Sequence, residues 1–212
     1  YPGERNTTDA HRRTMIKHGW SKLFDVDILD AEGPDLELPI PNGKRIQKNL
    51  VGKDIKNYDS MLVLSHFKGH PMGGFGGALK QLSIGCASSA GKANIHGAGK
   101  PEEMWTTEQN AFLESMADAA ESVVKLFDGK IVYINVMKNM SVDCDCCAVA
   151  EDPCMNDVGI LSSLDPVALD RACIDLVINS NDPGRDHFME RVNSRHGTHT
   201  IDAAEALGIG TQ

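Results

Sequence analysis

The chain has 212 residues, of which 41% are hydrophobic, and its formal net charge is −9. This length is enough for one large or two small domains with a substantial core. The acidic balance excludes a general binder of nucleic acids or anionic membranes, which needs a basic face. No apolar run approaches the ~20 residues that span a bilayer. We therefore expect a small-molecule or carboxylate ligand and neither nucleic acid nor membrane as partner. The composition leaves the oligomeric state open.

The N-terminal half shows one helix and three strands. Residues 8–19 have a capping threonine at their start and a glycine at their end, which predicts a helix. A looser segment at about 24–57, rich in turn residues, carries strand-like stretches at 36–40 and 44–51. The apolar run that starts at residue 61 predicts a buried strand to residue 67. The chain starts at Tyr1, and residues 207–212 read as the end of a helix that runs into another element, so we expect a piece of a longer protein, trimmed at both ends.

The C-terminal half alternates helices with strands. Apolar residues recur at helical spacing over 106–127, where Thr106 or Thr107 can serve as the N-cap. The run 131–137 is continuously apolar, as is typical of a parallel strand covered on both faces. A short strand at 158–161 and helices at 165–178, 185–193 and 202–207 follow. This alternation predicts a single α/β domain over 1–212, with a largely parallel central sheet and flanking helices.

A glycine-rich loop with basic side chains follows the strand at 61–67. Four glycines between the histidines and the next helix let a backbone approach a ligand and direct amide groups at negative charge. An imidazole suits acid/base catalysis at neutral pH, and lysines suit carboxylate binding or covalent tethering of a cofactor. The loop has no nucleotide-binding signature. We assign a catalytic role to Lys68, His70 and Lys80, and cofactor binding to Gly73, Gly74, Gly76, Gly77 and Lys80.

Four of the six cysteines lie within eleven residues. Their spacing matches neither a zinc finger nor a ferredoxin, but close cysteines suit metal binding or thiol chemistry better than a disulfide framework. Neighbouring aspartates are expected to raise the thiol pKa values, which favours bound metal over a reactive thiolate. Soft sulfur ligands favour zinc, iron–sulfur or nickel, in a reducing cytoplasm. The candidate metal ligands are Cys144, Cys146, Cys147 and Cys154, with Cys86 and Cys173 as structural cysteines.

Both clusters follow the end of a predicted strand. Ligands of open α/β sheets gather beyond the carboxyl ends of the strands. We therefore expect the loop near residue 70 and the loop near residue 145 to face each other across one site. The simpler alternatives are a tight turn with solvated lysines and a loop with hydrophobe-like cysteines.

Several motifs resemble the DUF362 family, whose members are often labelled iron–sulfur centre proteins. The matching segments are 65–70, 74–80, 85–88, 144–146, 157–161 and 165–168. Relatives often carry ferredoxin-like Cys-x-x-Cys repeats before the long helix, whereas residues 97–107 contain no cysteine. The iron–sulfur label therefore rests here on the cysteine cluster at 144–154 alone.

A more distant similarity is to nickel-pincer lactate racemase-type enzymes. In that family a histidine is the catalytic acid/base, a lysine tethers a pincer nucleotide cofactor, and a later histidine binds nickel. By resemblance these roles fall on His70, Lys80 and His96. The segment 3–7 departs from the family pattern, because the second catalytic histidine is missing there.

These observations lead to three hypotheses. The leading one is a cytoplasmic metal- or iron–sulfur-binding protein, an enzyme of undefined reaction with its site between the two loops. The second is a nickel-pincer-type racemase or isomerase of a 2-hydroxy acid. The third is a non-enzymatic electron carrier or metal-storage protein.

Overall fold

The computed structural model of the chain describes residues 4–147 and 149–212. Its central sheet has the strand order β3 (Met61–His66), β6 (Ile131–Met137) and β7 (Gly159–Ser163). Strand β3 is parallel to β6, and β7 is antiparallel to it. Helices and strands are mixed, as expected for α/β, but the prediction of a largely parallel sheet was wrong. The described residues between β6 and β7 contain no crossover helix, so the chain returns in the opposite direction.

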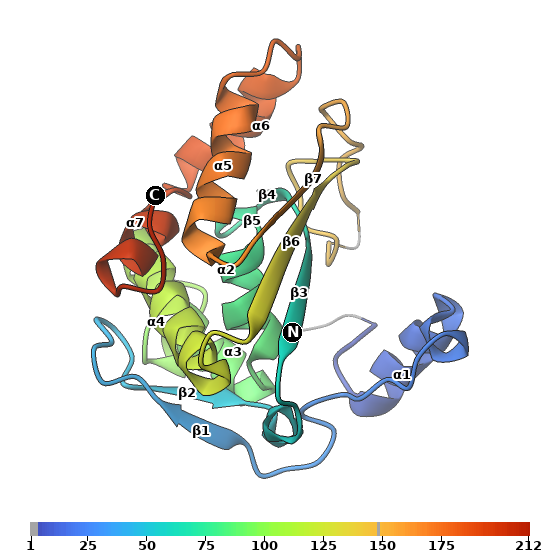
Figure 1. Cartoon of the computed structure of the whole chain (residues 1–212), viewed down its shortest axis with the longest axis vertical. Helices are drawn as coiled ribbons and strands as arrows, with labels where there is room; N and C mark the ends of the chain where they lie inside the picture. Colours follow the sequence, from blue (N-terminus) through green and yellow to red (C-terminus); the bar gives the residue numbers. More distant parts are fainter. Residues whose placement is uncertain (1–3, 148) are drawn as a thin grey trace.

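Helices cover one face of this sheet. Figure 1 shows α2 (Ala78–Lys80), α4 (Gln109–Phe127) and α5 (Pro166–Ile178) on the same side of β3, β6 and β7. Burial alternates along β6, where Tyr133 is buried and the neighbouring Val132 is exposed. The expectation that this strand is covered on both faces was therefore wrong. The outward residues of β6 are apolar too, so the sequence does not show the alternation of polar and apolar residues that is typical of a half-exposed strand.

Helix α4 begins one or two residues later than a cap at Thr107 or Thr106 would give. Its cap is Glu108, whose carboxylate accepts hydrogen bonds from the backbone N–H groups of Asn110 and Ala111. At the other end Asp128 adopts a left-handed conformation. The buried carboxylate of Asp118 accepts the backbone N–H groups of residues 44–46. This contact ties α4 to the hairpin of β1 (Leu36–Pro39) and β2 (Lys48–Val51).

The remaining helices are short. Helix α3 (Ser89–His96) lies in a stretch that the sequence left without an element, and Ser88 caps it by accepting from Gly91 N–H. Helices α6 (Arg185–Ser194) and α7 (His199–Ala206) follow α5. Single turns of other helical types lie at η1 (Trp20–Lys22), η2 (Lys53–Asn57), η3 (Gln81–Gly85) and η4 (Pro101–Glu103). Within the described part of the chain, no helix has the length and apolar character that crossing a membrane requires.

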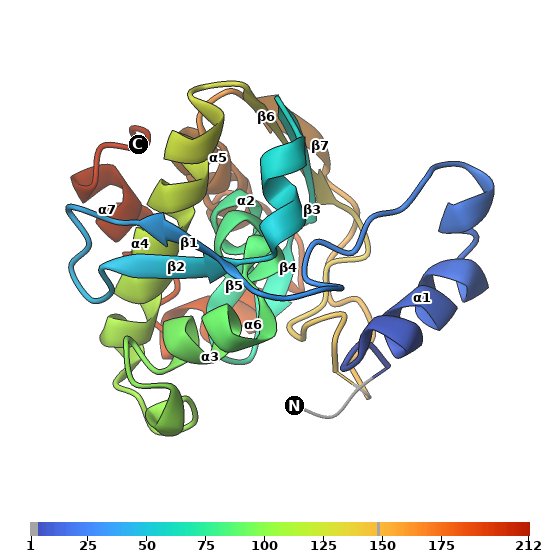
Figure 2. The same ribbon diagram turned by 90° about the horizontal axis from the view of Figure 1, so that it is seen from below.

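The N-terminal helix stands away from the rest of the molecule. Figures 1 and 2 show α1 (Thr8–Lys17) extending from the body in both views. It begins as predicted, with Thr7 accepting from Ala10 N–H, and none of its side chains is buried. Gly19 then turns the chain with a φ of +81°.

Candidate functional site

The glycine-rich loop is a small hairpin. Strands β4 (Lys68–His70) and β5 (Gly74–Gly76) pair antiparallel, with His70 opposite Gly74. Gly74 has a φ of +79°, and a Cβ there would lie 2.7 Å from the Cα of Gly197. Both facts require glycine at this turn. The hairpin places Lys68 and His70 immediately beyond the C-terminal end of β3.

The cysteine segment packs directly on this hairpin. Gly69 N–H donates a 2.8 Å hydrogen bond to Ser141 C=O. A Cβ on Gly69 would lie only 2.5 Å from the Cα of Val142, so the two backbones touch because residue 69 has no side chain. The two loops expected to face each other across one site are therefore in direct contact, and a shared functional site remains a prediction.

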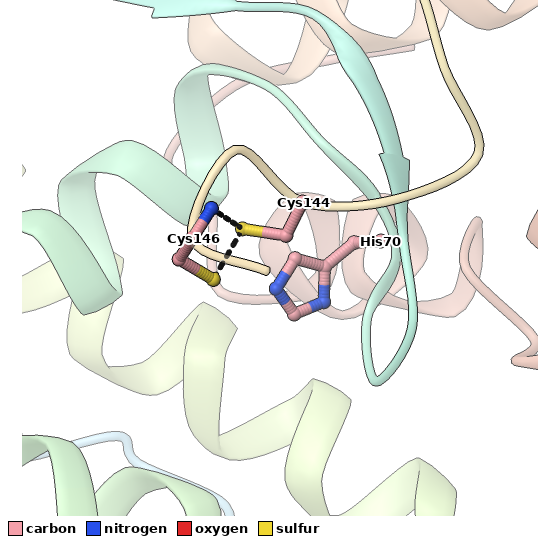
Figure 3. A group of neighbouring side chains, drawn as sticks. All are labelled: His70, Cys144 and Cys146. Atoms are coloured by element: carbon pink, nitrogen blue, oxygen red, sulfur yellow. Dashed lines mark hydrogen bonds between the residues drawn. The ribbon is translucent and has the colours of Figure 1, made fainter. Parts of the chain in front are cut away.

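Three potential ligand atoms converge where the loops meet. One such atom from each of His70, Cys144 and Cys146 lies within 4.8 Å of the others (Figure 3). The Cys146 thiol donates to Cys144 Sγ at 2.7 Å, and the backbone N–H of Cys146 donates to the same sulfur at 3.4 Å. Cys144 is buried and Cys146 is exposed, so the thiol pair can be reached from solvent on the side of Cys146.

The surroundings favour a thiolate on Cys144. The hydrogen bond from Cys146 lowers the pKa of Cys144, burial opposes this, and His70 and the charge of Lys80 lower it further. The same hydrogen bond raises the pKa of Cys146. The prediction that nearby acids raise all these thiol pKa values was therefore wrong for Cys144. The pKa values of Cys146 and Cys154 are raised, but the leading causes are the hydrogen bond to Cys144 and burial, and not the flanking aspartates.

The orientation of His70 makes it a hydrogen-bond donor toward the sulfurs. Its Nδ1 accepts the backbone N–H groups of Met72 at 3.1 Å and Gly73 at 2.9 Å. The proton of the neutral ring must then be on Nε2, the nitrogen that faces the two cysteines in Figure 3. Burial and the charge of Lys80 lower the pKa of His70 to about 4, so the ring is neutral at pH 7.

A charged network borders the cluster. Lys68 Nζ lies 3.2 Å from a carboxylate oxygen of Asp145, and His66 Nδ1 lies 3.0 Å from the same carboxylate. His66 Nε2 lies 2.7 Å from Lys138 C=O, so both ring nitrogens face acceptors. The hydrogen bond to Asp145 raises the pKa of His66. Two basic side chains thus offset the acid that separates Cys144 from Cys146.

Lys80 is the remaining basic group of the site. Within residues 4–147 and 149–212, no hydrogen bond or ion pair engages its Nζ. A Cβ on Gly76 would lie 3.5 Å from Lys80 Cδ and 3.6 Å from Lys68 Nζ, so both lysine side chains pass beside this glycine. Burial lowers the pKa of Lys80, Cys144 opposes this, and Lys68 adds to the lowering. The geometry leaves the amino group of Lys80 available to a ligand.

A comparison with family models identifies the chain. The model described as "Domain of unknown function (DUF362)" matches residues 2–175. The chain belongs to the DUF362 family. No curated protein and no solved structure gives a match. The family description assigns no reaction, so the function of this DUF362 chain has to be argued from its site.

The backbone amide groups that follow the hairpin of this DUF362 chain, at the start of α2, already have a protein partner. Asp170, buried on α5, accepts the backbone N–H groups of Ala78 at 2.8 Å and Leu79 at 3.0 Å. Asn135 Nδ2 donates to the same carboxylate at 2.8 Å. Sequence reasoning missed Asp170, although an acid among the apolar positions of a helix signals a buried, hydrogen-bonded carboxylate. Cofactor binding by the four glycines remains a prediction.

Other predicted ligands lie outside the three-residue group in the described part of the chain. Cys154 Sγ donates to Met140 C=O at 3.4 Å, and Cys147 donates its backbone N–H to Cys144 C=O. His96 donates from Nδ1 to Lys92 C=O at 2.7 Å and stacks on Phe112 with centroids 4.9 Å apart. Metal binding by these three residues remains a prediction. Of the segment 3–7, residue 3 lies outside the described residues.

A cavity of about 460 Å³ lies elsewhere, between α4, α7 and the turn at 42–44. Its lining residues are Asn42, Lys44, Glu114, Asp118, His199, Asp202, Ala203, Ala206 and Leu207. The carboxylate of Glu114 pairs with Lys44, Arg45 and His199. The carboxylate of Asp118 accepts the backbone N–H groups of residues 44–46. These acids hold the fold together, and none of the thiol-cluster residues lines the cavity.

The thiolate on Cys144 predicts an unusual pH dependence. Because the pKa of Cys144 is lowered, the far-ultraviolet thiolate absorbance should already be present at neutral pH, below the ordinary thiol pKa of about 8.5. It should decline only on further acidification. Cys144→Ser should remove this absorbance and Cys154→Ser should leave it. An absorbance that first appears above about pH 8 in the unmodified protein would contradict the assignment.

Proposed function

We propose that this DUF362 chain binds a thiophilic divalent metal ion through Cys144 and Cys146. The observation that carries the proposal is the convergence of two sulfurs and one imidazole at the junction of two loops. Two soft sulfur donors favour zinc, nickel or ferrous iron over magnesium or calcium. A reducing compartment such as the cytoplasm would keep the pair available as thiols.

The donor atoms fit such an ion with a small adjustment. Zinc–sulfur bonds of about 2.3 Å in a tetrahedral site require the sulfurs to lie further apart than their present 2.7 Å. Cys146 is exposed and can move outward. His70 carries its proton on the nitrogen that faces the sulfurs, so we assign it to hydrogen bonding with Cys144 and not to coordination. A cluster with four cysteine ligands is disfavoured, because only two sulfurs converge among the described residues.

The neighbouring lysines support an enzymatic role. Lys68 and Lys80 converge over Gly76, beside the proposed metal ligands. With two protein ligands, the ion would keep coordination positions open for a substrate, as catalytic sites do. A carboxylate-bearing small molecule satisfies both features, since it can pair with an ammonium group and coordinate the ion. His70 lies close enough to the two cysteines to serve as acid/base for a ligand bound there. Its lowered pKa keeps the ring neutral until about pH 4.

Anaerobic metal titration tests the proposal. We expect stoichiometric binding of zinc, and of cobalt with sulfur-to-metal charge-transfer absorption, in the unmodified protein. Cys144→Ser and Cys146→Ser should each weaken binding at least ~100-fold, comparable to or beyond the effect of losing a supporting group at a metal site. Cys154→Ser is the matched control and should bind normally. His70→Gln should weaken binding less than either serine variant.

Two results would overturn it. One is an unmodified, reduced protein that binds no thiophilic metal. The other is a Cys154→Ser variant that loses as much affinity as Cys144→Ser, which would move the site to a different part of the cysteine segment.

A second candidate function is favoured by Lys80. Its Nζ has no partner among the described residues, and its lowered pKa increases the share of uncharged, nucleophilic amine. These properties suit the covalent cofactor attachment of a nickel-pincer-type isomerase acting on a 2-hydroxy acid. His96, with its Nε2 free of its proton, would be the nickel ligand. The test is intact mass after expression in a host that makes the cofactor. An addition that is lost in Lys80→Arg supports this candidate, and an unmodified mass rejects it.

A further inference from the structure

The central sheet leaves an apolar face uncovered. The outward side chains of Leu62, Leu64, Val132 and Ile160 are 60%, 55%, 42% and 64% exposed. Leu62 pairs in register with Val132, so these side chains are neighbours across β3 and β6. No layer of the described chain covers this face, although the solvated face of a sheet normally carries polar side chains. Contiguous exposed apolar surface of this kind marks an interaction site.

The same chain carries an apolar segment that lacks a partner. We call residues 4–24, which contain α1 and η1, the arm. Its side chains Ile16, Trp20, Leu23 and Phe24 are 59%, 51%, 72% and 62% exposed. The rings of Trp20 and Phe24 lie 6.3 Å apart and form a joint aromatic surface. In both views the arm extends on the side of the sheet that the helices leave open (Figures 1 and 2).

The arm and the rest of the chain, which we call the body, have net charges of opposite sign. The arm holds five Lys and Arg residues and two acids, a net charge of +3. The whole chain has a net charge of −9, so the remaining residues carry −12. A basic, apolar arm and an acidic body with an apolar face are complementary in both respects, and two identical chains therefore attract each other in the arm-to-body orientation.

The base of the arm is held at the body. Tyr58 Oη donates to Asp27 at 3.0 Å, and Asp54 N–H donates to Leu29 C=O. These contacts fix the point from which the arm leaves the body.

We propose that two copies of the chain form a dimer in which each arm packs its apolar side on the uncovered sheet face of the other copy. Such an exchange is isologous, because the same two surfaces are used twice. It supplies the missing layer of the sheet. His66 lies on β3 two residues beyond Leu64, in the same outward row, so the exchanged arm would border the thiol site.

Oligomeric state and mixing experiments test the exchange. Sedimentation and light scattering on the unmodified chain should show a dimer. An arm variant, Leu23→Glu, and a face variant, Leu64→Glu, should each raise the dissociation constant at least about tenfold. An equimolar mixture of the two variants should regain part of the association, because the arm of the face variant meets the intact face of the arm variant. Leu176→Glu, an exposed position on α5, is the control and should remain dimeric.

Several outcomes would overturn the exchange. An unmodified chain that is monomeric would show that the arm does not bind the sheet face of a second copy. A dimer that survives Leu23→Glu but not Leu64→Glu would indicate direct stacking of two sheets. A mixture that regains nothing would exclude reciprocal contacts. Far-ultraviolet circular dichroism checks folding, and Ile160→Glu provides a second face variant should Leu64→Glu fail to fold.

Discussion

Gly69→Ala is expected to open the site without removing any of its functional groups. The new Cβ would lie 2.5 Å from the Cα of Val142 and equally close to the Val142 carbonyl. Backbone atoms cannot yield as a flexible side chain can, so the cysteine segment has to move away from the hairpin. We expect a loss of about 1–3 kcal/mol in the free energy of unfolding, typical of overpacking. Metal affinity should fall as well, about as far as in His70→Gln, because Cys144 and Cys146 move together and lose the hydrogen bond of His70.

The matched control is Gly73→Ala in the same hairpin. A Cβ on Gly73 would make only ordinary contacts, the nearest at 3.4 Å, and the backbone N–H that binds His70 would remain. Urea unfolding and cobalt titration should therefore show Gly73→Ala close to the unmodified protein. If Gly69→Ala bound cobalt as tightly as the unmodified protein, the contact between hairpin and cysteine segment would not support the site.

Asp170→Ala is expected to destabilise the fold strongly. It would leave the backbone N–H groups of Ala78 and Leu79 and the amide of Asn135 without their buried acceptor. At about 1–3 kcal/mol for each unsatisfied donor, the loss should be about 3 kcal/mol or more. Thermal or urea unfolding measures it. Asp175→Ala on the same helix removes an ion pair at the surface with Arg171 and should cost less than about 1 kcal/mol.

The pH dependence of the free energy of unfolding reports the effect of the charge on Asp170. Burial raises the pKa of Asp170 from 3.8 to about 6, which means that folding favours its protonated form. The part of the stability that depends on this proton is therefore complete below pH 3.8 and is lost as the pH rises through about 6. Asp170→Asn should remove this decline. An unchanged pH profile in Asp170→Asn would show that another group causes it.

The sequence predicted the principal elements of the fold because their signals are local. The helix expected over 165–178 is α5, and Asp165 caps it, with its carboxylate accepting from the backbone N–H groups of Val167 and Ala168. The alternation of strands and helices also placed the hairpin and the cysteine segment beyond the ends of two neighbouring strands. Local patterns failed where partners come from far along the chain. Ser88 can cap a helix only if α3 has something to pack against, and β4 and β5 pair through residues that read as a turn.

The site shows the same division. His70, Cys144 and Cys146 are recognisable from sequence as groups with metal or thiol chemistry, because their side chains carry that chemistry in any fold. Their roles depended on contacts between distant segments. Asp145 was expected to raise the pKa of nearby thiols, but His66 and Lys68 pair with it. Asp170 was not recognised because its three donors lie 35 to 92 residues away.

By itself, then, the sequence determined which residue types meet at the ends of β3 and β6 and which family the motifs resemble. Only the tertiary structure decided the direction of β7, the exposure of one sheet face, the direction of proton donation at His70 and the charge on Cys144. The physical reason is that composition and spacing act along the chain, whereas strand direction, burial and pKa depend on neighbours that folding brings together through space.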